Sequence, residues 1–258
     1  RSSDLLNGVK VNGVGTDGLV GQRGIGFTAV DCRSEKTNRT GVGYGFHVIE
    51  SNVVKFLGCY GAGNRHSFDV DEVRDVLYLG CTAVGDSSCG ISTHGNSDVA
   101  KVISCTVRDC GGGIITRGKN TMIKDNQIFG TMLNAESSDT YLGGILLGDD
   151  GTHSWGAGLA GTNLSIEGNF IDLSGSDFAS TGTLPDAIYS TAPLVNARIV
   201  GNHIAGFGRH GIYGKGDTNT GVLIAGNRID GSSQNSVLAG TFAMGIYLAP
   251  GHDTVAAN

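Results

Sequence analysis

The sequence has little proline, few charges and no long apolar run, and each shortage excludes a class of protein. Among 258 residues there are 3 prolines and 1 tryptophan, and Asp, Glu, Lys and Arg together make up 16 %. No stretch approaches the roughly 18 consecutive apolar residues of a membrane-spanning helix. A net charge of −6 leaves no basic stripe for nucleic acid or for an acidic membrane. We therefore expect neither nucleic acid nor a membrane as a partner.

Glycine is the residue that the chain has in excess. Its 44 glycines amount to about 17 %, where roughly 7 % is usual. Because the excess comes without proline and without a Gly-X-Y period, it excludes collagen and indicates a fold with very many turns. The chain begins Arg1-Ser2-Ser3-Asp4, with neither an initiating Met nor a signal peptide. We expect residues 1–258 to form a single domain, processed or cut from a longer chain.

An internal repeat predicts the architecture. A short apolar strand, a small or polar residue, and then Cys or Asn recur along the chain. From Cys32 to Asn126 the steps are 27, 22, 24 and 21 residues, the length of one coil of a three-sided solenoid. The Cys or Asn falls at Cys32, Cys59, Cys81, Cys105, Asn126, Asn169, Asn202 and Asn227.

A second marker, a small residue followed by an apolar one, runs in phase with the first. It precedes the next Cys or Asn by 13 to 15 residues in the first four coils that carry it. The two markers together predict an all-β, right-handed parallel β-helix of about nine or ten coils with loop insertions. The second marker falls at Gly45-Phe46, Ser67-Phe68, Gly90-Ile91, Gly113-Ile114, Gly144-Ile145, Ala187-Ile188, Gly211-Ile212 and Gly245-Ile246.

Equivalent residues of successive coils should stack about 4.8 Å apart. An inward Asn at the turn can then bond its neighbours above and below and satisfy backbone groups that the bend would bury. The four cysteines share this column, and we predict buried free thiols. The stacking distance exceeds the roughly 3.5–4.5 Å between Cβ atoms that a disulfide requires.

Side-chain alternation after the second marker defines two columns that point away from the core. Asp71, His94 and Arg117 should therefore line one face on three successive coils, with Asp69 beside them and Arg65 and His66 entering the same strand. The first column is His47, Asp69, Ser92, Ile115, Leu146, Tyr189, Tyr213 and Tyr247. The second is Ile49, Asp71, His94, Arg117, Gly148, Thr191, Lys215 and Ala249.

A carboxylate, an imidazole and a guanidinium on one solvent-facing sheet suit uronate chemistry. A cation neutralises the sugar carboxylate, and a base removes the acidified C5 proton. The candidate catalytic residues are Asp71, His94, Arg117, Asp69 and His66. One alternative is that these charges only pair across neighbouring strands. Another is glycoside hydrolysis by two carboxylates, drawn from Asp69, Asp71 and Glu72 or from Asp149 and Asp150.

The interval between Asn126 and Asn169 rises to 43 residues, as does that between Gly144 and Ala187. Loops should therefore project from the solenoid in these intervals and could bind a substrate. They are expected over 132–141, 149–160 and 174–185, and Trp155 and His153 lie in the second. The tyrosines of the first column could bind sugar or form the interface of a trimer. Candidate substrate-binding residues are Arg65, Trp155, Tyr189, Tyr213, Lys215 and Tyr247.

Two families resemble the chain. The Asn column and the segments Arg65-His66-Ser67-Phe68 and Ser92-Thr93-His94-Gly95 resemble pectin-lyase-like β-helices of bacteriophage tailspike depolymerases. Tyr44-Gly45-Phe46, followed one coil later by Arg65-His66-Ser67-Phe68, resembles secreted mannuronan C5-epimerases. That family continues with Asp-Pro-His-Glu, which carries its catalytic Asp and His. Here His47-Val48-Ile49-Glu50 follows, so the catalytic pair is absent at the matching positions.

The tailspike resemblance implies a homotrimer on the phage tail that binds and degrades a bacterial surface polysaccharide, as a lyase or a glycosidase. The alternatives are a secreted alginate-type lyase or C5-epimerase, and a non-catalytic glycan-binding solenoid. We expect no cofactor and no bound metal, with Ca²⁺ kept as an alternative. The sequence does not specify the sugar or its linkage.

Overall fold

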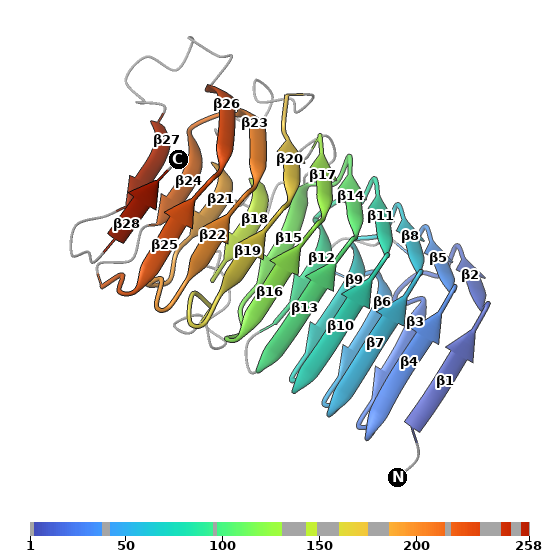
Figure 1. Cartoon of the computed structure of the whole chain (residues 1–258). Coiled ribbons are helices and arrows are strands. Elements are labelled where there is room, and N and C mark those ends of the chain that lie inside the picture. Colours follow the sequence, from blue (N-terminus) through green and yellow to red (C-terminus); the bar gives the residue numbers. More distant parts are fainter. Residues whose placement is uncertain are drawn as a thin grey trace.

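The computed structural model describes residues 3–37, 42–94, 97–130, 143–148, 160–174, 186–214, 218–232, 244–248 and 254–257. All regular structure in these ranges is β-strand, arranged as three parallel sheets of ten, nine and nine strands (Figure 1). Successive strands belong to different sheets, so that the chain winds once around the core for every three strands. The three-sided parallel β-helix predicted from the repeat is confirmed. Parallel connections of this kind are right-handed in nearly all proteins, in agreement with the expected right-handed solenoid.

Each sheet runs the length of the solenoid, from the N-terminal to the C-terminal end in Figure 1. Sheet A contains β1 (Ser3–Asn7), β4 (Gly26–Val30), β7 (Val53–Leu57), β10 (Asp75–Leu79), β13 (Val99–Ile103), β16 (Thr121–Lys124), β19 (Ser165–Glu167), β22 (Arg198–Val200), β25 (Val222–Ala225) and β28 (Thr254–Ala257). Sheet B contains β2 (Lys10–Asn12), β5 (Arg33–Glu35), β8 (Tyr60–Ala62), β11 (Thr82–Val84), β14 (Thr106–Arg108), β17 (Gln127–Phe129), β20 (Phe170–Asp172), β23 (His203–Phe207) and β26 (Arg228–Ser232). Sheet C contains β3 (Leu19–Gln22), β6 (Tyr44–Ile49), β9 (His66–Asp71), β12 (Cys89–Thr93), β15 (Gly112–Thr116), β18 (Gly143–Leu147), β21 (Asp186–Ser190), β24 (His210–Gly214) and β27 (Met244–Leu248).

The asparagines of the turn column form the predicted ladder. Asn126 Nδ2 donates to Val102 O and to Asn169 Oδ1, both at 2.9 Å, and the same Oδ1 accepts the Asn126 backbone N–H at 3.0 Å. The pattern repeats from Asn169 to Asn202 and from there to Asn227. Each amide thus satisfies backbone groups of two coils that the bend would otherwise bury unpaired.

The cysteines of the same column are buried and free, as predicted. Their thiols make weak contacts with carbonyl oxygens, such as that of Cys81 Sγ with Phe56 O at 3.3 Å. Cys81 also interacts with the thiols of Cys59 and Cys105. All six cysteines of the chain are free thiols in the structure.

The small residue of the second marker is required by the next coil. A Cβ added to Gly113 would lie 2.1 Å from Gly144 O, and one added to Gly144 would lie 2.6 Å from Ala187 O. Both distances are far below van der Waals contact, so that a larger side chain would force the coils apart. The apolar residue after the small one enters the core, where Phe46, Phe68 and the isoleucines that follow them stack in one column.

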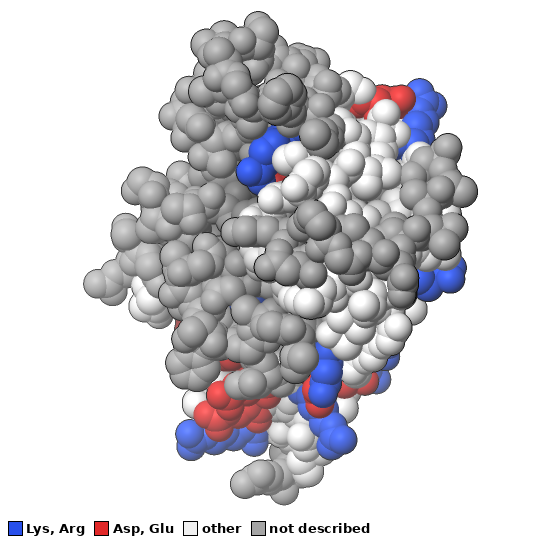
Figure 2. Space-filling view, turned by 90° about the vertical axis from the view of Figure 1, so that its left-hand side faces the viewer, with Lys and Arg blue, Asp and Glu red and all other residues white. Residues whose placement is uncertain are grey.

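Acidic and basic side chains are interspersed at the rim of the C-terminal face of the solenoid (Figure 2). On sheet A, charged side chains of neighbouring strands pair, such as Arg198 with Glu167 at 3.4 Å and Lys101 with Asp75 at 3.7 Å. Among the described residues there is no helix long and apolar enough to cross a bilayer.

Candidate active site on sheet C

The strand pairing of sheet C reproduces the first predicted outward column and the described part of the second, in which Lys215 and Ala249 lie outside the described residues. Asp69 pairs with His47 on one side and with Ser92 on the other, and the first column continues in this way to Tyr213 and Tyr247. In the second column Ile49 pairs with Asp71. The His94 and Arg117 amides donate to Val70 O and Thr93 O, the offset expected when His94 is paired with Asp71 and Arg117 with His94.

The prediction of a solvent-facing sheet is wrong for much of this face. Asp69 is 1 % exposed and Arg117 4 %. Ile115 and Leu146 are also buried and pack with Cys89 in an apolar cluster outside the main core, against which Tyr189 lies. Alternation fixes the side of the sheet to which a side chain points, but burial depends on what covers that side.

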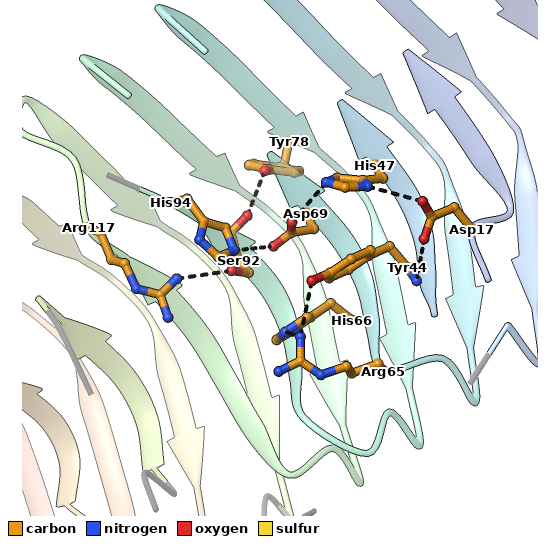
Figure 3. A network of polar contacts seen from close by, with 10 residues as sticks. All are labelled: Asp17, Tyr44, His47, Arg65, His66, Asp69, Tyr78, Ser92, His94 and Arg117. Atoms are coloured by element: carbon orange, nitrogen blue, oxygen red, sulfur yellow. Dashed lines mark hydrogen bonds and ion pairs between the residues drawn. The ribbon is translucent and has the colours of Figure 1, made fainter. Parts of the chain in front are cut away.

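Asp69 is the centre of the polar network in Figure 3. Its Oδ1 lies 3.1 Å from His94 Nε2, and its Oδ2 lies 3.6 Å from His47 Nε2. The other ring nitrogen of His47 lies 3.3 Å from Asp17 Oδ2. Asp17 precedes β3, so residues from four successive coils form one chain of carboxylates and imidazoles.

Asp69 and His94 shift each other's protonation. Burial alone would raise the pKa of Asp69, but the charge of the adjacent His94 outweighs it and holds that pKa well below its usual range. The Asp69 carboxylate in turn raises the pKa of His94 against the opposing effect of burial. The His94 side chain is 20 % exposed, so it is an imidazole of increased basicity that solvent can reach.

His66 is held in one protonation state. Its Nδ1 lies 2.9 Å from Cys89 O, which can only accept, so Nδ1 carries the proton. Its Nε2 then accepts from Arg65 Nη1 at 3.0 Å. Burial lowers the pKa of His66 to about 4, which agrees with a neutral ring. These contacts fit a residue that positions Arg65 better than the catalytic residue predicted from the sequence.

Arg65 connects His66 to Tyr44. Arg65 Nη1 lies 3.2 Å from the Tyr44 hydroxyl, and the rings of Tyr44 and His66 are stacked at 5.6 Å. Burial first, and then the charge of Asp69, raises the pKa of Tyr44 to about 12. The Tyr44 hydroxyl therefore keeps its proton at neutral pH and can donate it.

Asp71 and Arg117 lie in the predicted column but not in the predicted roles. The carboxylate that faces His94 is that of Asp69, and Asp71 makes no side-chain hydrogen bond or ion pair with any described residue. Arg117 Nη1 lies 3.5 Å from Ser92 Oγ. Buried behind His94, Arg117 supplies a positive charge that opposes protonation of that ring.

Three residues of the network were missed from the sequence: Asp17, Tyr44 and His47. His47 stands next to Asp69 in the first column, and Tyr44 pairs with His66, so the strand register could have identified both. Asp17 lies outside the strands, and no spacing rule indicated it.

The predicted tyrosine stripe also forms. The rings of Tyr189 and Tyr213 are stacked at 5.1 Å and 3° between planes, and Tyr247 follows at 5.2 Å. Because Tyr189 and Tyr213 stack face to face, the two stacked faces cover each other and are not available to a sugar ring. The other predicted loop and binding residues lie outside the described ranges: Trp155, His153, Lys215, Asp149 and Asp150.

Within the described ranges no group of three His, Cys, Asp or Glu side chains is arranged to hold a metal ion. The chain matches no family model and no curated protein sequence. We therefore interpret the site from its geometry. It offers a basic imidazole backed by a buried carboxylate, a protonated phenol, and the Arg65 guanidinium beside that phenol. These groups can neutralise an acidic ligand and move a proton to or from it.

Proposed function

We propose that this β-helix binds an acidic polysaccharide at sheet C and breaks it by β-elimination, with His94 as the proton acceptor. The observation that supports this most is the contact between His94 and the buried Asp69. A carboxylate in this position orients the imidazole and makes it a stronger base, as an activated general base requires.

In the proposed reaction Arg65 neutralises the carboxylate of a uronate sugar and so acidifies its C5 proton. Neutral His94 takes that proton through Nδ1, since Nε2 faces Asp69. The electron pair of the C5–H bond forms a C4=C5 double bond as the C4–O4 bond breaks. The leaving O4 takes a proton from the Tyr44 hydroxyl, which solvent then reprotonates.

The geometry favours elimination over hydrolysis. Hydrolysis requires one carboxyl group that keeps a proton to give to the leaving group. Asp69 is buried and paired, and its lowered pKa keeps it ionised, so it suits the role of orienting His94 better than that of an acid.

Tyr44 also supports a second candidate, C5 epimerisation. The first step is the same removal of the C5 proton by His94. If Tyr44 then returns a proton to C5 from the opposite side, the configuration inverts and no bond of the polymer is broken.

One assay on capsular, O-antigen and alginate polysaccharides separates these reactions. Elimination produces the absorbance of the unsaturated uronate together with new reducing ends, whereas hydrolysis produces reducing ends alone. Epimerisation produces neither, but in D₂O it incorporates deuterium at C5. We expect the absorbance, and we expect Tyr44→Phe to abolish it while Tyr60→Phe on sheet B does not. Failure of every acidic polysaccharide to give any of the three signals would contradict the proposal.

We further propose a bacterial surface polysaccharide as the substrate and a homotrimer on a phage tail as the setting. The support is the solenoid fold together with the Arg-His and Thr-His segments that resemble tailspike depolymerases. Light scattering tests the assembly, because a stable trimer is expected for a tailspike, and a monomer would favour a secreted lyase.

A further inference from the structure

The Arg-His pair of the candidate site occurs a second time at the same position of another coil. Arg65-His66-Ser67-Phe68 leads into β9, and Arg209-His210-Gly211-Ile212 leads into β24. Both strands belong to sheet C and are separated by five strand steps. At about 4.8 Å per step, the two pairs lie about 24 Å apart along the axis.

The second pair is built around a buried carboxylate. Asp186 Oδ1 accepts from Arg209 Nε at 3.1 Å and from the His210 backbone N–H at 2.9 Å, and it lies 2.9 Å from His210 Nδ1. Arg209 Nη2 contacts Asp186 Oδ2. Asp186 is 2 % exposed, so the guanidinium is anchored along one edge.

Two tyrosine rings hold the same guanidinium from the side. Arg209 Cζ lies 4.9 Å from the centre of the Tyr213 ring and 5.7 Å from that of Tyr189. The Arg209 side chain remains 33 % exposed. Asp186 takes two of the five N–H donors of the guanidinium, so an oriented cation remains partly exposed beside the tyrosine rings. Such a cation suits a carboxylate on a sugar.

Proton transfer is not expected at this second cluster. His210 is buried, stacked on Tyr213 at 4.6 Å and in contact with Asp186. The position equivalent to Asp69 is Tyr213. No basic imidazole comparable to His94 therefore faces outward from the described part of this cluster.

We infer that Arg209, with Tyr189 and Tyr213, is a second, non-catalytic binding site for a uronate sugar of the same acidic polymer. This inference rests on the proposed function. The buried Ile115 and Leu146 separate the two clusters along the sheet, so the polymer is held at two points. Holding two points of one chain raises its apparent affinity without any new contact at the reacting sugar.

The test compares a long polymer with a short fragment of it. In a His94→Ala background, alginate binding is measured by affinity electrophoresis for the parent and for the double variant Asp186→Asn/Arg209→Gln, which removes the ion pair without leaving a buried charge. The control is Glu167→Gln/Arg198→Gln, which removes an exposed ion pair of sheet A with the same zero change in net charge. We expect the double variant to bind alginate at least about tenfold more weakly and the control to bind unchanged.

Turnover of an alginate tetrasaccharide by chains that keep His94 separates this inference from the proposed reaction. The tetrasaccharide reaches only one cluster, so the double variant should process it as the parent does. Unchanged alginate binding by a folded double variant would overturn the inference, as would failure of the parent to bind alginate, pectate or hyaluronan. Binding that depends on Arg209 without any turnover would remove the proposed reaction and support the second site.

Discussion

The two halves of the solenoid use one backbone repeat with different side chains. Up to Cys105 the turn column holds cysteines and the core holds stacked aromatic rings, such as Phe46 on Phe68 at 4.9 Å. From Asn126 onward the turn column holds hydrogen-bonded asparagines. The core position of Phe68 is taken by isoleucines already from Ile91 onward. Because equivalent residues of successive coils stack on one another, residues of the same type can follow one another in one column over several coils.

The same contrast holds on the outer face of sheet C. Both halves carry an Arg-His pair beside tyrosine and a buried carboxylate. In the first half that carboxylate is Asp69, which lies in the outward column that follows the His66 position along the strand. Asp69 contacts the accessible His94. In the second half Asp186 stands at the Arg-His position itself and is enclosed by Arg209 and His210. Under the proposed function, the column that carries the carboxylate distinguishes the cluster assigned to proton transfer from the one assigned to binding alone.

The largest expected effect is on turnover, and it should differ between variants of the two clusters. His94→Ala should lower turnover of the acidic glycan by roughly 10²–10⁴-fold, the usual contribution of a general base. His210→Gln, which keeps an N–H donor for Asp186, should leave turnover of a short oligosaccharide unchanged. Initial rates are compared for variants whose circular dichroism matches the parent. Equal losses in both variants would contradict the distinction.

The pH dependence of turnover tests the contact between Asp69 and His94. His94 must be neutral to accept a proton, and Asp69 raises its pKa above the usual value of about 6.5. Activity should therefore be low in acid and rise with increasing pH through that raised pKa. Asp69→Asn removes the negative charge, so the midpoint should move to lower pH and the maximal rate should fall, because the base is weaker. A midpoint unchanged in Asp69→Asn would exclude Asp69 as the cause.

A smaller effect compares the two turn columns. Asn202→Ala leaves Ile166 O and the neighbouring asparagines without their buried partners, and it should destabilise the chain by about 1–3 kcal/mol. Cys81→Ala removes a few weak thiol contacts and a little volume, so it should cost less. Urea denaturation measures both, and glycan specificity should not change. A larger loss for Cys81→Ala would reverse our view of the two columns.

The smallest expected signal is the labelling of native thiols. Cys32, Cys59, Cys81 and Cys105 are all about 1 % exposed, so a thiol reagent should modify them slowly until the chain is unfolded. The rate is followed by mass spectrometry with and without urea. Fast native labelling of all four would place them outside the core.

Much of the fold could be predicted because a solenoid repeats itself. The two markers specified the coil length, the turn column, the free thiols and the partners of each strand in sheet C. The candidate site could be predicted only as a set of columns. His94 and Asp69 were both named as candidates, but their direct contact was not predicted. Asp17 and the contact between Asp186 and Arg209 gave no signal in the repeat.

The sequence by itself determined which residues stack, because parallel strands one coil apart must keep equivalent residues in register and alternate their side chains between core and surface. Only the tertiary structure decided which neighbours within and between columns touch, and which outward side chains are covered. Those outcomes depend on rotamers and on burial by other parts of the chain. Arg117 points outward by alternation and is nevertheless buried, whereas His94, one coil away, remains within reach of solvent.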